Sequence, residues 1–341
     1  MSAAEATVAP RRGGVHWRRL ARKHAWTLGI YVLLLGLILY WRTIPEDWGT
    51  FDVQSLAIDA LPFAFVAMAQ AVVIISGGID LSVGSMMSLV NVLSAKYMLV
   101  DPLTAETVSF RKALFIAAAL ILGAALAGAL TGLIIQVTRV ADIIVTLAML
   151  FVWAGAALAV MEIPGGGVPL EFTKLGVGYT LTPWLPTGLV ILAGVVLLVW
   201  VPIRWQKPGL ALYAVGSSRN ASFLSGISVA KSRIGAYALG SALAAMGGLA
   251  LTATSGIGDA LSGQYYTLNS VAATVLGGVS LLGGVGGLIG PIAAAFVLTL
   301  VKSLMILKGV DQNWAQVIQG TLIVLVVMVG GLALRQRGKN L

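Results

Sequence analysis

Side chains that could carry out enzymatic chemistry are scarce in this sequence. It contains no cysteine, which excludes disulfides, thiolate metal sites and thiol nucleophiles. The two histidines, His16 and His24, both lie in a basic N-terminal segment, so the apolar body of the chain has no imidazole to act as a general base or metal ligand. No GxxxxGK[ST] phosphate-binding loop occurs in the 341 residues. We therefore predict a protein that is not an enzyme and binds no metal or cofactor itself.

A polar stretch, residues 206–233, lies between two long apolar runs and has helix punctuation of its own. Its basic side chains are those of Lys207, Arg219, Lys231 and Arg233. Ser217 or Ser218 can cap the start of a short helix, which Gly226 can end in a left-handed turn. A long, folded and basic connection predicts a binding partner on that side. The alternative is an ordinary solvated loop whose positive charge only fixes the topology.

The composition identifies the class of protein that holds this stretch. Hydrophobic residues make up 58% of the chain and charged residues only 10%, against roughly 45–50% and about 25% in soluble domains. The net charge of +9 is carried by residues that fall between apolar runs, as topology signals do. They do not gather on amphipathic or aromatic-interleaved segments, so we expect membrane lipid around the chain and no nucleic acid partner.

The apolar runs predict an all-α integral membrane protein of about ten transmembrane helices. The predicted spans are residues 25–41, 57–75, 85–100, 113–137, 142–161, 185–203, 234–254, a helix beginning near 268, 288–307 and 314–334. They divide the chain into a basic cytoplasmic arm at 1–24, a transmembrane domain at 25–334 and a cytoplasmic tail at 335–341. Most of the Lys and Arg residues then lie in the cytoplasm, and so do both termini. The glycine-rich region between helices eight and nine can instead hold a re-entrant segment.

Four short runs, taken together and in order, carry a family resemblance. They are GGIDLSVGS at 77–85, IVTLAM at 144–149, YAVGSSRNASFLSGI at 213–227 and VLGGVSLLGGVGGLIGP at 275–291. The chain resembles the permease subunits of bacterial ABC importers for monosaccharides, the ribose/xylose/arabinose group. The resemblance extends from about residue 56 to 334 and implies a subunit that forms the translocation pathway for a monosaccharide or related polyol.

The resemblance also implies partners and a location. It places the chain in the bacterial inner membrane as a multi-pass protein, paired with a second permease copy or a paralogue. A cytoplasmic ATP-binding cassette ATPase would lie beneath each half, and an extracytoplasmic sugar-binding protein would dock outside. Because the sequence has no phosphate-binding loop, ATP hydrolysis is expected on the separate ATPase subunit.

In this family the segment between the sixth and seventh spans resembles a coupling helix that fits a cleft in the ATPase. The residues implied in that contact are Arg219, Asn220, Ala221, Phe223, Leu224, Ser225, Gly226 and Ile227. Phe223 and Leu224 would supply a small apolar plug. The family often has acidic residues in this helix, whereas this chain has Arg219, Asn220 and Ser222, which changes the charge pairing expected with the ATPase.

A sugar is uncharged and rich in hydroxyls, so its path needs neutral hydrogen-bonding groups at helix faces and helix breaks. The candidates are Gln70, Ser76, Ser82, Asn91, Thr146, Asn269, Thr274, Gln316 and Gln319. Each of them can instead hydrogen-bond a neighbouring helix. We add Asp80, although a carboxylate costs about 3 kcal/mol at mid-membrane. For Asp80 an interfacial role, capping the helix that begins near Ser82, is the favoured alternative.

Two other functions are alternatives to this one. An ion- or proton-coupled secondary transporter of a small polar solute would need titratable groups deep in several helices. The plausible ones are few, chiefly Lys96 and Lys302 near outer ends. A membrane-embedded enzyme would need a nucleophile, a base or metal ligands, which the missing cysteine and core histidine disfavour.

Two similar strings predict internal symmetry. SGGIDLSVG at 76–84 and SGIGDALSG at 255–263 share serine, glycine and aspartate in nearly the same order and lie five spans apart. An odd offset means opposite orientation, so we hypothesise an inverted repeat of two five-helix halves. Helices two to five would match seven to ten, with the pathway at the interface, and Thr146 would pair with Thr321. Chance glycine richness is the alternative.

Overall fold

The computed structural model describes residues 16–101, 103–321, 324 and 328, and these are predominantly helical. The long helices are α1 (His16–Trp41), α2 (Thr50–Ile75), α3 (Val83–Met98), α4 (Phe110–Thr138), α5 (Asp142–Val160), α11 (Val229–Ser255), α12 (Gln264–Leu276) and α13 (Ile289–Leu307). The sixth predicted span is one helix, Thr187–Trp205, made of α7 (Thr187–Val195), a π-helical turn η1 (Val196–Trp200) and α8 (Val201–Trp205). The all-α membrane fold is therefore confirmed.

The number of spans stays a prediction. Six of the described helices are long and apolar enough to cross a membrane, and the apolar part of α1, Trp26–Trp41, is shorter. α3 and α12 have only 16 and 13 residues, fewer than the ~20 that a straight span needs. Residues 312–321 are helical where the tenth span was expected. Apart from 324 and 328, the rest of that span lies outside the described residues, as do most of the arm and the whole of the tail.

Several boundaries differ from the expected ones. α1 already begins at His16, inside the arm that was assigned to residues 1–24. Two short strands, β1 (Leu99–Asp101) and β2 (Glu106–Thr107), pair antiparallel after α3, and α6 (Leu170–Val177) lies in the connection before α7. α12 begins at Gln264 rather than near residue 268. These short elements lie in connections, where the hydrophobic pattern gives no signal.

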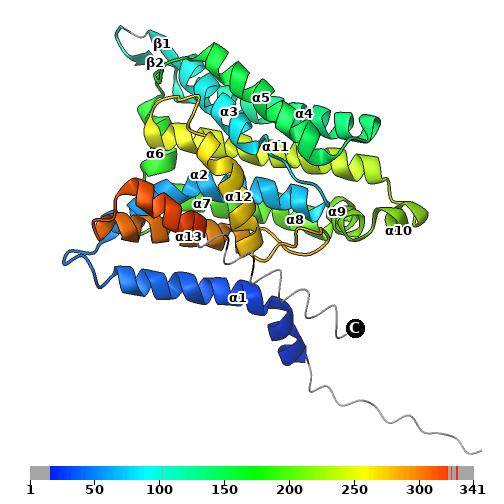
Figure 1. Cartoon of the computed structure of the whole chain (residues 1–341). Coiled ribbons are helices and arrows are strands. Elements are labelled where there is room, and N and C mark those ends of the chain that lie inside the picture. The colour runs from blue at the N-terminus through cyan, green and yellow to red at the C-terminus, as the bar shows by residue number, and fades with distance from the viewer. Residues whose placement is uncertain (1–15, 102, 322–323, 325–327, 329–341) are drawn as a thin grey trace, which may run out of the picture.

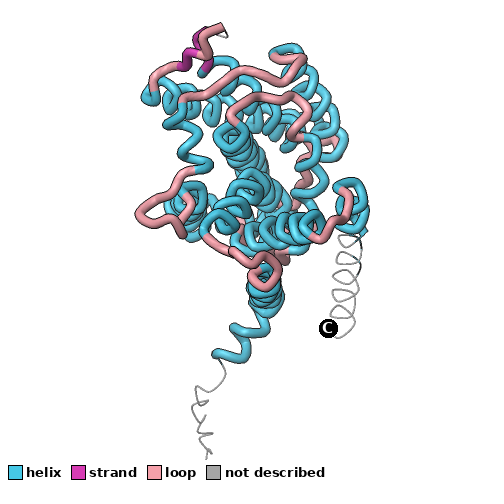
Figure 2. Tube along the Cα trace, turned by 90° about the vertical axis from the view of Figure 1, so that its left-hand side faces the viewer, coloured by secondary structure: helices cyan, strands magenta, loops and turns pink. Residues whose placement is uncertain are grey.

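α2 and α11 form the centre of the helix bundle (Figure 1). In α2, 89% of the most apolar window is buried, against 22% in α4 and in α5. The exposed side chains of α4, α5 and α7 are mostly apolar, as expected of helices that face lipid tails. α1 lies at one edge of the bundle against α13, and Trp26 Nε1 donates to the carbonyl of Leu276, the last residue of α12, at 2.7 Å. Figure 2, turned by 90°, shows most helices nearly end on.

α4 packs closely on α11 through two glycines spaced four residues apart. A Cβ added to Gly128 would overlap the Tyr237 carbonyl and the side chain of Ser241, and one added to Gly132 would lie 2.9 Å from Ile234 Cα. These glycines therefore allow the backbones to approach, as in other small-xxx-small pairs of membrane helices. The contact fixes the start of α11 relative to the end of α4, which brings the polar ends of both helices together.

Candidate functional site

The predicted short helix of the 206–233 stretch is present as α10, Arg219–Leu224. Ser218 is its N-cap, and the Ser218 hydroxyl accepts a hydrogen bond from Ala221 N at 3.3 Å. The chain leaves the helix through Gly226, whose φ of +77° lies in the left-handed region that favours glycine. Ser217 does not cap it, because residues Lys207–Ser217 form another helix, α9, that the sequence pattern did not reveal.

α10 presents its apolar side chains to the surroundings. Phe223 and Leu224 are 73% and 85% exposed. Arg219, Asn220, Ala221, Ser225 and Gly226 are exposed as well, and Ile227 is half-buried. Exposed large apolar side chains on a short capped helix are typical of a docking surface. All the residues predicted for coupling therefore lie on α10 or in the turn that follows it. We call this end of the bundle the α10 end (Figure 1).

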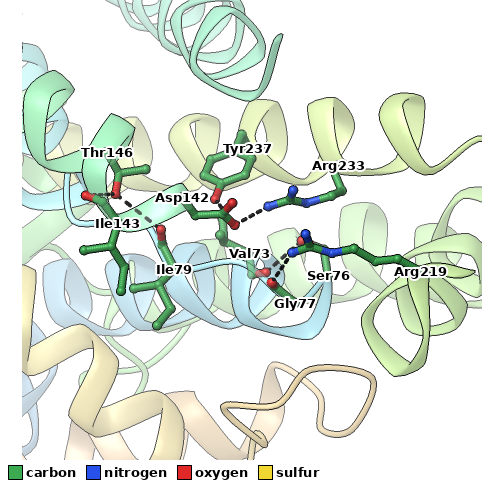
Figure 3. Close-up of polar contacts among 10 residues, drawn as sticks. All are labelled: Val73, Ser76, Gly77, Ile79, Asp142, Ile143, Thr146, Arg219, Arg233 and Tyr237. Carbon is green, nitrogen blue, oxygen red and sulfur yellow. Dashed lines mark hydrogen bonds and ion pairs between the residues drawn. The ribbon is translucent and has the colours of Figure 1, made fainter. Parts of the chain in front are cut away.

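α10 is tied to the helix bundle by an arginine. The Arg219 Nη2 atom donates to the Gly77 carbonyl at 2.9 Å (Figure 3). Gly77 belongs to the 76–82 turn between α2 and α3, so a movement of α10 acts directly on that turn. On the neighbouring helix, Arg233 forms an ion pair with Asp142 at the start of α5, and the Tyr237 hydroxyl donates to the same carboxylate at 3.0 Å.

α9 anchors the same region to the 277–288 connection. The Tyr213 hydroxyl donates to the Gly286 carbonyl at 2.8 Å, and Gly284 N donates to the carbonyl of Ile75 at 2.9 Å. Burial raises the pKa of the Tyr213 phenol, so it stays a neutral donor at physiological pH. The turns that follow α2 and α12 therefore meet α9 at the α10 end. This is where the 206–233 stretch contacts the helix bundle.

The predicted pathway residues near this end already have hydrogen-bond partners within the protein. Asp80 is 1% exposed, and its Oδ1 atom accepts from the Ser82 backbone N–H at 2.8 Å and the Ser82 hydroxyl at 2.6 Å. Asp80 therefore stabilises the turn before α3, which begins at Val83, but it does not cap the helix, because its partner Ser82 is the N-cap residue. Ser76 donates to the Val73 carbonyl at 2.8 Å, and Thr146 donates to the Ile79 carbonyl at 3.3 Å. All four side chains are buried and hold the 76–82 turn in place.

Asn91, further along α3, is used in the same structural way. Its Nδ2 atom donates to Thr252 Oγ1 at 2.8 Å and to the Ile257 carbonyl at 3.1 Å. Its Oδ1 atom accepts from Asp259 N at 2.7 Å. The amide therefore fixes the connection between α11 and α12, with both donors and the acceptor engaged.

The remaining candidates divide by burial. Thr274 is buried and donates to the Ala67 carbonyl at 3.1 Å, whereas Gln316 is exposed. The half-buried Asn269 donates to the Tyr265 carbonyl at 2.6 Å, and Gln319 Oε1 accepts from the Tyr265 hydroxyl at 3.1 Å. Gln70 is fully buried, and neither of its amide atoms has a partner among the described residues. It is the predicted pathway residue with the most unused hydrogen-bonding capacity.

A cavity of about 410 Å³ opens at the opposite end, among α2, α11, α12, α13 and the helix that follows. It is rich in hydroxyl groups, those of Thr254, Ser255, Tyr265, Tyr266, Thr299 and Ser303. Asp59 and Lys302 also line it, and Lys302 Nζ lies 5.0 Å from the centre of the Tyr265 ring. Aromatic rings with neutral hydroxyls suit a small polar solute.

Sequence reasoning missed this cavity. None of the ten predicted pathway residues lines it, although Asn269 and Gln319 hold Tyr265 in place. The adjacent tyrosines 265 and 266, with Lys302 on a later apolar run, were the available signal. Their significance depends on α12 lying against α13, which no local pattern contains. Among the described residues no three His, Cys, Asp or Glu side chains form a group that could hold a metal ion.

Comparison with known proteins gives a consistent set of relatives. The chain is 31% identical over 310 residues to the ribose import permease protein RbsC of Escherichia coli K12, covering 87% of this chain and 91% of the relative. It is 30% identical to RbsC of Bacillus subtilis 168, covering 92% and 94%. It is 28% identical to the fructose import permease protein FrcC of Rhizobium meliloti, covering 89% and 82%. No solved structure matches the chain.

A family model also matches residues 52–327, from the start of α2 into the helix after α13. Its description is "Branched-chain amino acid transport system / permease component". The match includes the α10 segment, both similar turns and the hydroxyl-rich cavity. Because it covers far more than half of the chain and the ribose permeases align over nearly their whole length, the chain belongs to this family of transport-system permease components.

Proposed function

We propose that the chain is the transmembrane permease subunit of an ATP-binding cassette importer that carries a monosaccharide or related polyol across the bacterial inner membrane. The observation that carries this proposal is the similarity to ribose and fructose import permeases over about nine tenths of the chain. A relationship that spans whole proteins concerns the transport pathway itself, not one shared module. It also favours a subunit of an ATP-driven importer over an ion-coupled transporter.

In this proposal α10 is the element that an ATPase subunit grips. A capped helix with two exposed apolar side chains can enter a cleft. The hydrogen bond from Arg219 to the Gly77 carbonyl would transmit a displacement of α10 to the 76–82 turn. Because α10 carries arginine and no acidic residue, its partner cleft is expected to be acidic. This orientation places the α10 end and both termini in the cytoplasm, and the hydroxyl-rich cavity toward the outside.

The hydroxyl-rich cavity is then the first site that a sugar meets after leaving an extracytoplasmic binding protein. Its tyrosines offer ring faces for the apolar side of a pyranose or furanose, and its hydroxyls match sugar hydroxyls. The volume of about 410 Å³ is within the range of small-molecule sites. A second permease copy or paralogue would complete the pathway around it.

One observation favours a second solute. Asp59 and Lys302 line the same cavity, and a carboxylate and an ammonium can bind the two charges of an amino acid zwitterion. The matching family model is described by branched-chain amino acid transport. A branched-chain amino acid is therefore the second candidate, with its apolar side chain against Phe63 and Ile58.

Transport by the reconstituted system tests both candidates. The chain would be placed in proteoliposomes with its ATPase and binding protein, and uptake of labelled ribose, fructose and leucine would be measured with and without ATP. ATP-dependent uptake of a sugar is the expected result. ATP-dependent uptake of leucine alone would support the second candidate, and uptake driven by a proton gradient without the ATPase would overturn both.

A further inference from the structure

A second cavity, of about 490 Å³, lies at the α10 end, bounded by the end of α4, the start of α5, α10 and the start of α11. Three guanidinium groups line it, those of Arg139, Arg219 and Arg233. The single acidic side chain in the lining is Asp142. The cavity therefore has an excess of two positive charges, and an anion is the ligand that balances it.

Two hydrogen-bond donors in this lining have no partner among the described residues. They are Arg233 Nε, on a side chain that is 3% exposed, and Gln136 Nε2, which is also buried. Buried donors are almost always satisfied in native proteins, so we expect each of them to meet an acceptor once these side chains adjust to a ligand. The contacts with Asp142 and Gly77 use only one nitrogen each of Arg233 and Arg219. Several guanidinium donors remain for a ligand.

The ends of three helices add to the positive electrostatic potential in this cavity. α5 begins at Asp142 and α11 begins at Val229 after the Ser228 N-cap, and both starts border the cavity. The first turns of these helices carry free backbone N–H groups and the positive ends of the helix dipoles. Oxyanions bind where helix N-termini and arginines converge. The C-terminal end of α4 also borders the cavity, and its C-cap residue Arg139 supplies a positive charge.

We propose that this arginine-lined cavity binds a phosphate group, and that the group belongs to the headgroup of an anionic lipid. Exposed apolar side chains of α4 and α5 lie close in sequence to residues that line the cavity, those of Leu133, Val137, Ile143 and Ile144. They face the lipid tails in a helix bundle of this kind, so a lipid can lay its chains along them while its phosphate enters the cavity. A free phosphate ion is the other source of the same chemistry.

The proposed occupant would connect α10 to α4 and α11, which already pack closely on each other but make few contacts with α10. Arg219 and Phe223 belong to α10, Arg139 ends α4, and Arg233 lies on α11. A phosphate held by all three arginines would stiffen the attachment of α10 to the membrane helices. The lipid composition of the inner leaflet would then affect how well a push on α10 reaches the 76–82 turn. This consequence rests on the proposed function, whereas phosphate binding does not.

Binding can be measured on the purified chain without any partner. The chain would be delipidated in neutral detergent, and phosphatidylglycerol or phosphatidylcholine would be added and quantified by native mass spectrometry, with inorganic phosphate as a competitor. Arg139→Gln and Arg219→Gln remove cavity charges, and both side chains are exposed, so the fold should be retained. Lys231→Gln is the matched control, because Lys231 is an exposed basic residue at the start of α11 that does not line the cavity.

We expect phosphatidylglycerol to bind in preference to phosphatidylcholine and each arginine variant to bind it about fivefold more weakly. The control should bind as the wild type does. Binding of inorganic phosphate that prevents lipid binding would assign the site to free phosphate. Equal binding of both lipids, or equal binding by all variants, would overturn the proposal. So would an absence of binding combined with weaker ATPase association of the arginine variants, which would assign the cavity to an acidic side chain of the partner.

Discussion

Gly84 at the start of α3 and Gly263 just before α12 contact each other reciprocally. A Cβ added to either glycine would overlap the carbonyl oxygen of the other. Gly263 also donates through its N–H to Ser88 Oγ at 2.9 Å, and a Cβ on Gly84 would overlap Thr267 Oγ1. Ser88 follows Gly84 at the spacing at which Thr267 follows Gly263. Contacts in which equivalent residues exchange roles are the mark of a two-fold axis.

The first prediction concerns this crossing. Gly84→Ala and Gly263→Ala should each destabilise the protein by about 1–3 kcal/mol, because the added methyl group meets backbone that cannot move aside. Thermal unfolding in detergent measures the effect. Gly123→Ala in α4 is the control, since no atom of another element lies within 4 Å of the position that its Cβ would take. Equal melting temperatures for the three variants would contradict the close crossing.

The second prediction is that the two halves form an inverted repeat. The spacing that relates Ser76 to Ser255 also relates Phe110, the first residue of α4, to Ile289, the first residue of α13. In an experimental structure, residues 50–128 should superpose on 229–307 after rotation about an axis in the membrane plane near Gly84. The prediction would be contradicted if the two halves superposed only in the same membrane orientation, or did not superpose at all.

One detail of the symmetry hypothesis, the pairing of Thr146 with Thr321, stays a prediction. The spacing that relates Ser76 to Ser255 does not extend to this pair, because α4 has 29 residues and α13 only 19. The surroundings differ as well: Thr146 is buried against the Ile79 carbonyl, whereas Thr321 is exposed and donates to the Val317 carbonyl in its own helix. The two threonines therefore do not have equivalent hydrogen-bond partners.

The third prediction tests the ion pair of Asp142 and Arg233. Asp142→Asn leaves a buried guanidinium without its counter-ion, which should destabilise the protein by about 3–5 kcal/mol. The double variant Asp142→Leu with Arg233→Met removes both charges and should recover most of that loss in thermal unfolding. Asp47→Asn, at an exposed position, should change nothing. A double variant that melts at a lower temperature than Asp142→Asn would contradict the prediction that the two charges matter chiefly by balancing each other.

The fourth prediction concerns α10 as the contact for an ATPase. Phe223→Asp and Leu224→Asp should insert and fold normally, because both side chains are exposed, yet lose ATPase association or substrate-stimulated ATP hydrolysis. Gly226→Val should act similarly, since a β-branched residue at a φ of +77° is strained by about 1–3 kcal/mol. Leu210→Asp on α9, also exposed, is the control. Normal uptake by all three α10 variants would leave this stretch an ordinary basic loop.

The fifth prediction separates the two candidate solutes. For a sugar, Lys302→Gln and Asp59→Asn each remove one hydrogen bond at most, so KM for uptake should rise about fivefold. For an amino acid zwitterion, each change breaks a charge pair worth about 2–5 kcal/mol, and KM should rise at least about thirtyfold. We expect the smaller effect, with Tyr265→Phe as the neutral comparison in the same cavity. Uptake assays in proteoliposomes measure these KM values.

The sequence by itself determined the membrane class, the positions of the long helices and the capped helix after Ser218. These features follow from local chemistry. Long apolar runs need a lipid environment. The Ser218 hydroxyl caps the start of a helix and Gly226 adopts the left-handed turn after its end, and both roles depend only on neighbouring residues. The string shared by residues 76–84 and 255–263 likewise marks the two similar turns through residue types alone.

Only the tertiary structure decided which polar side chains are free to bind. Asp80, Asn91 and Thr146 looked suitable by residue type, but each is engaged with backbone or neighbouring side chains, those of Asn91 and Thr146 from distant parts of the chain. The two cavities arise where α2 meets α13 and where α4 meets α11, and their lining comes from elements far apart in the sequence. Hydrogen-bond partners and cavities depend on helix packing, which local periodicity does not encode.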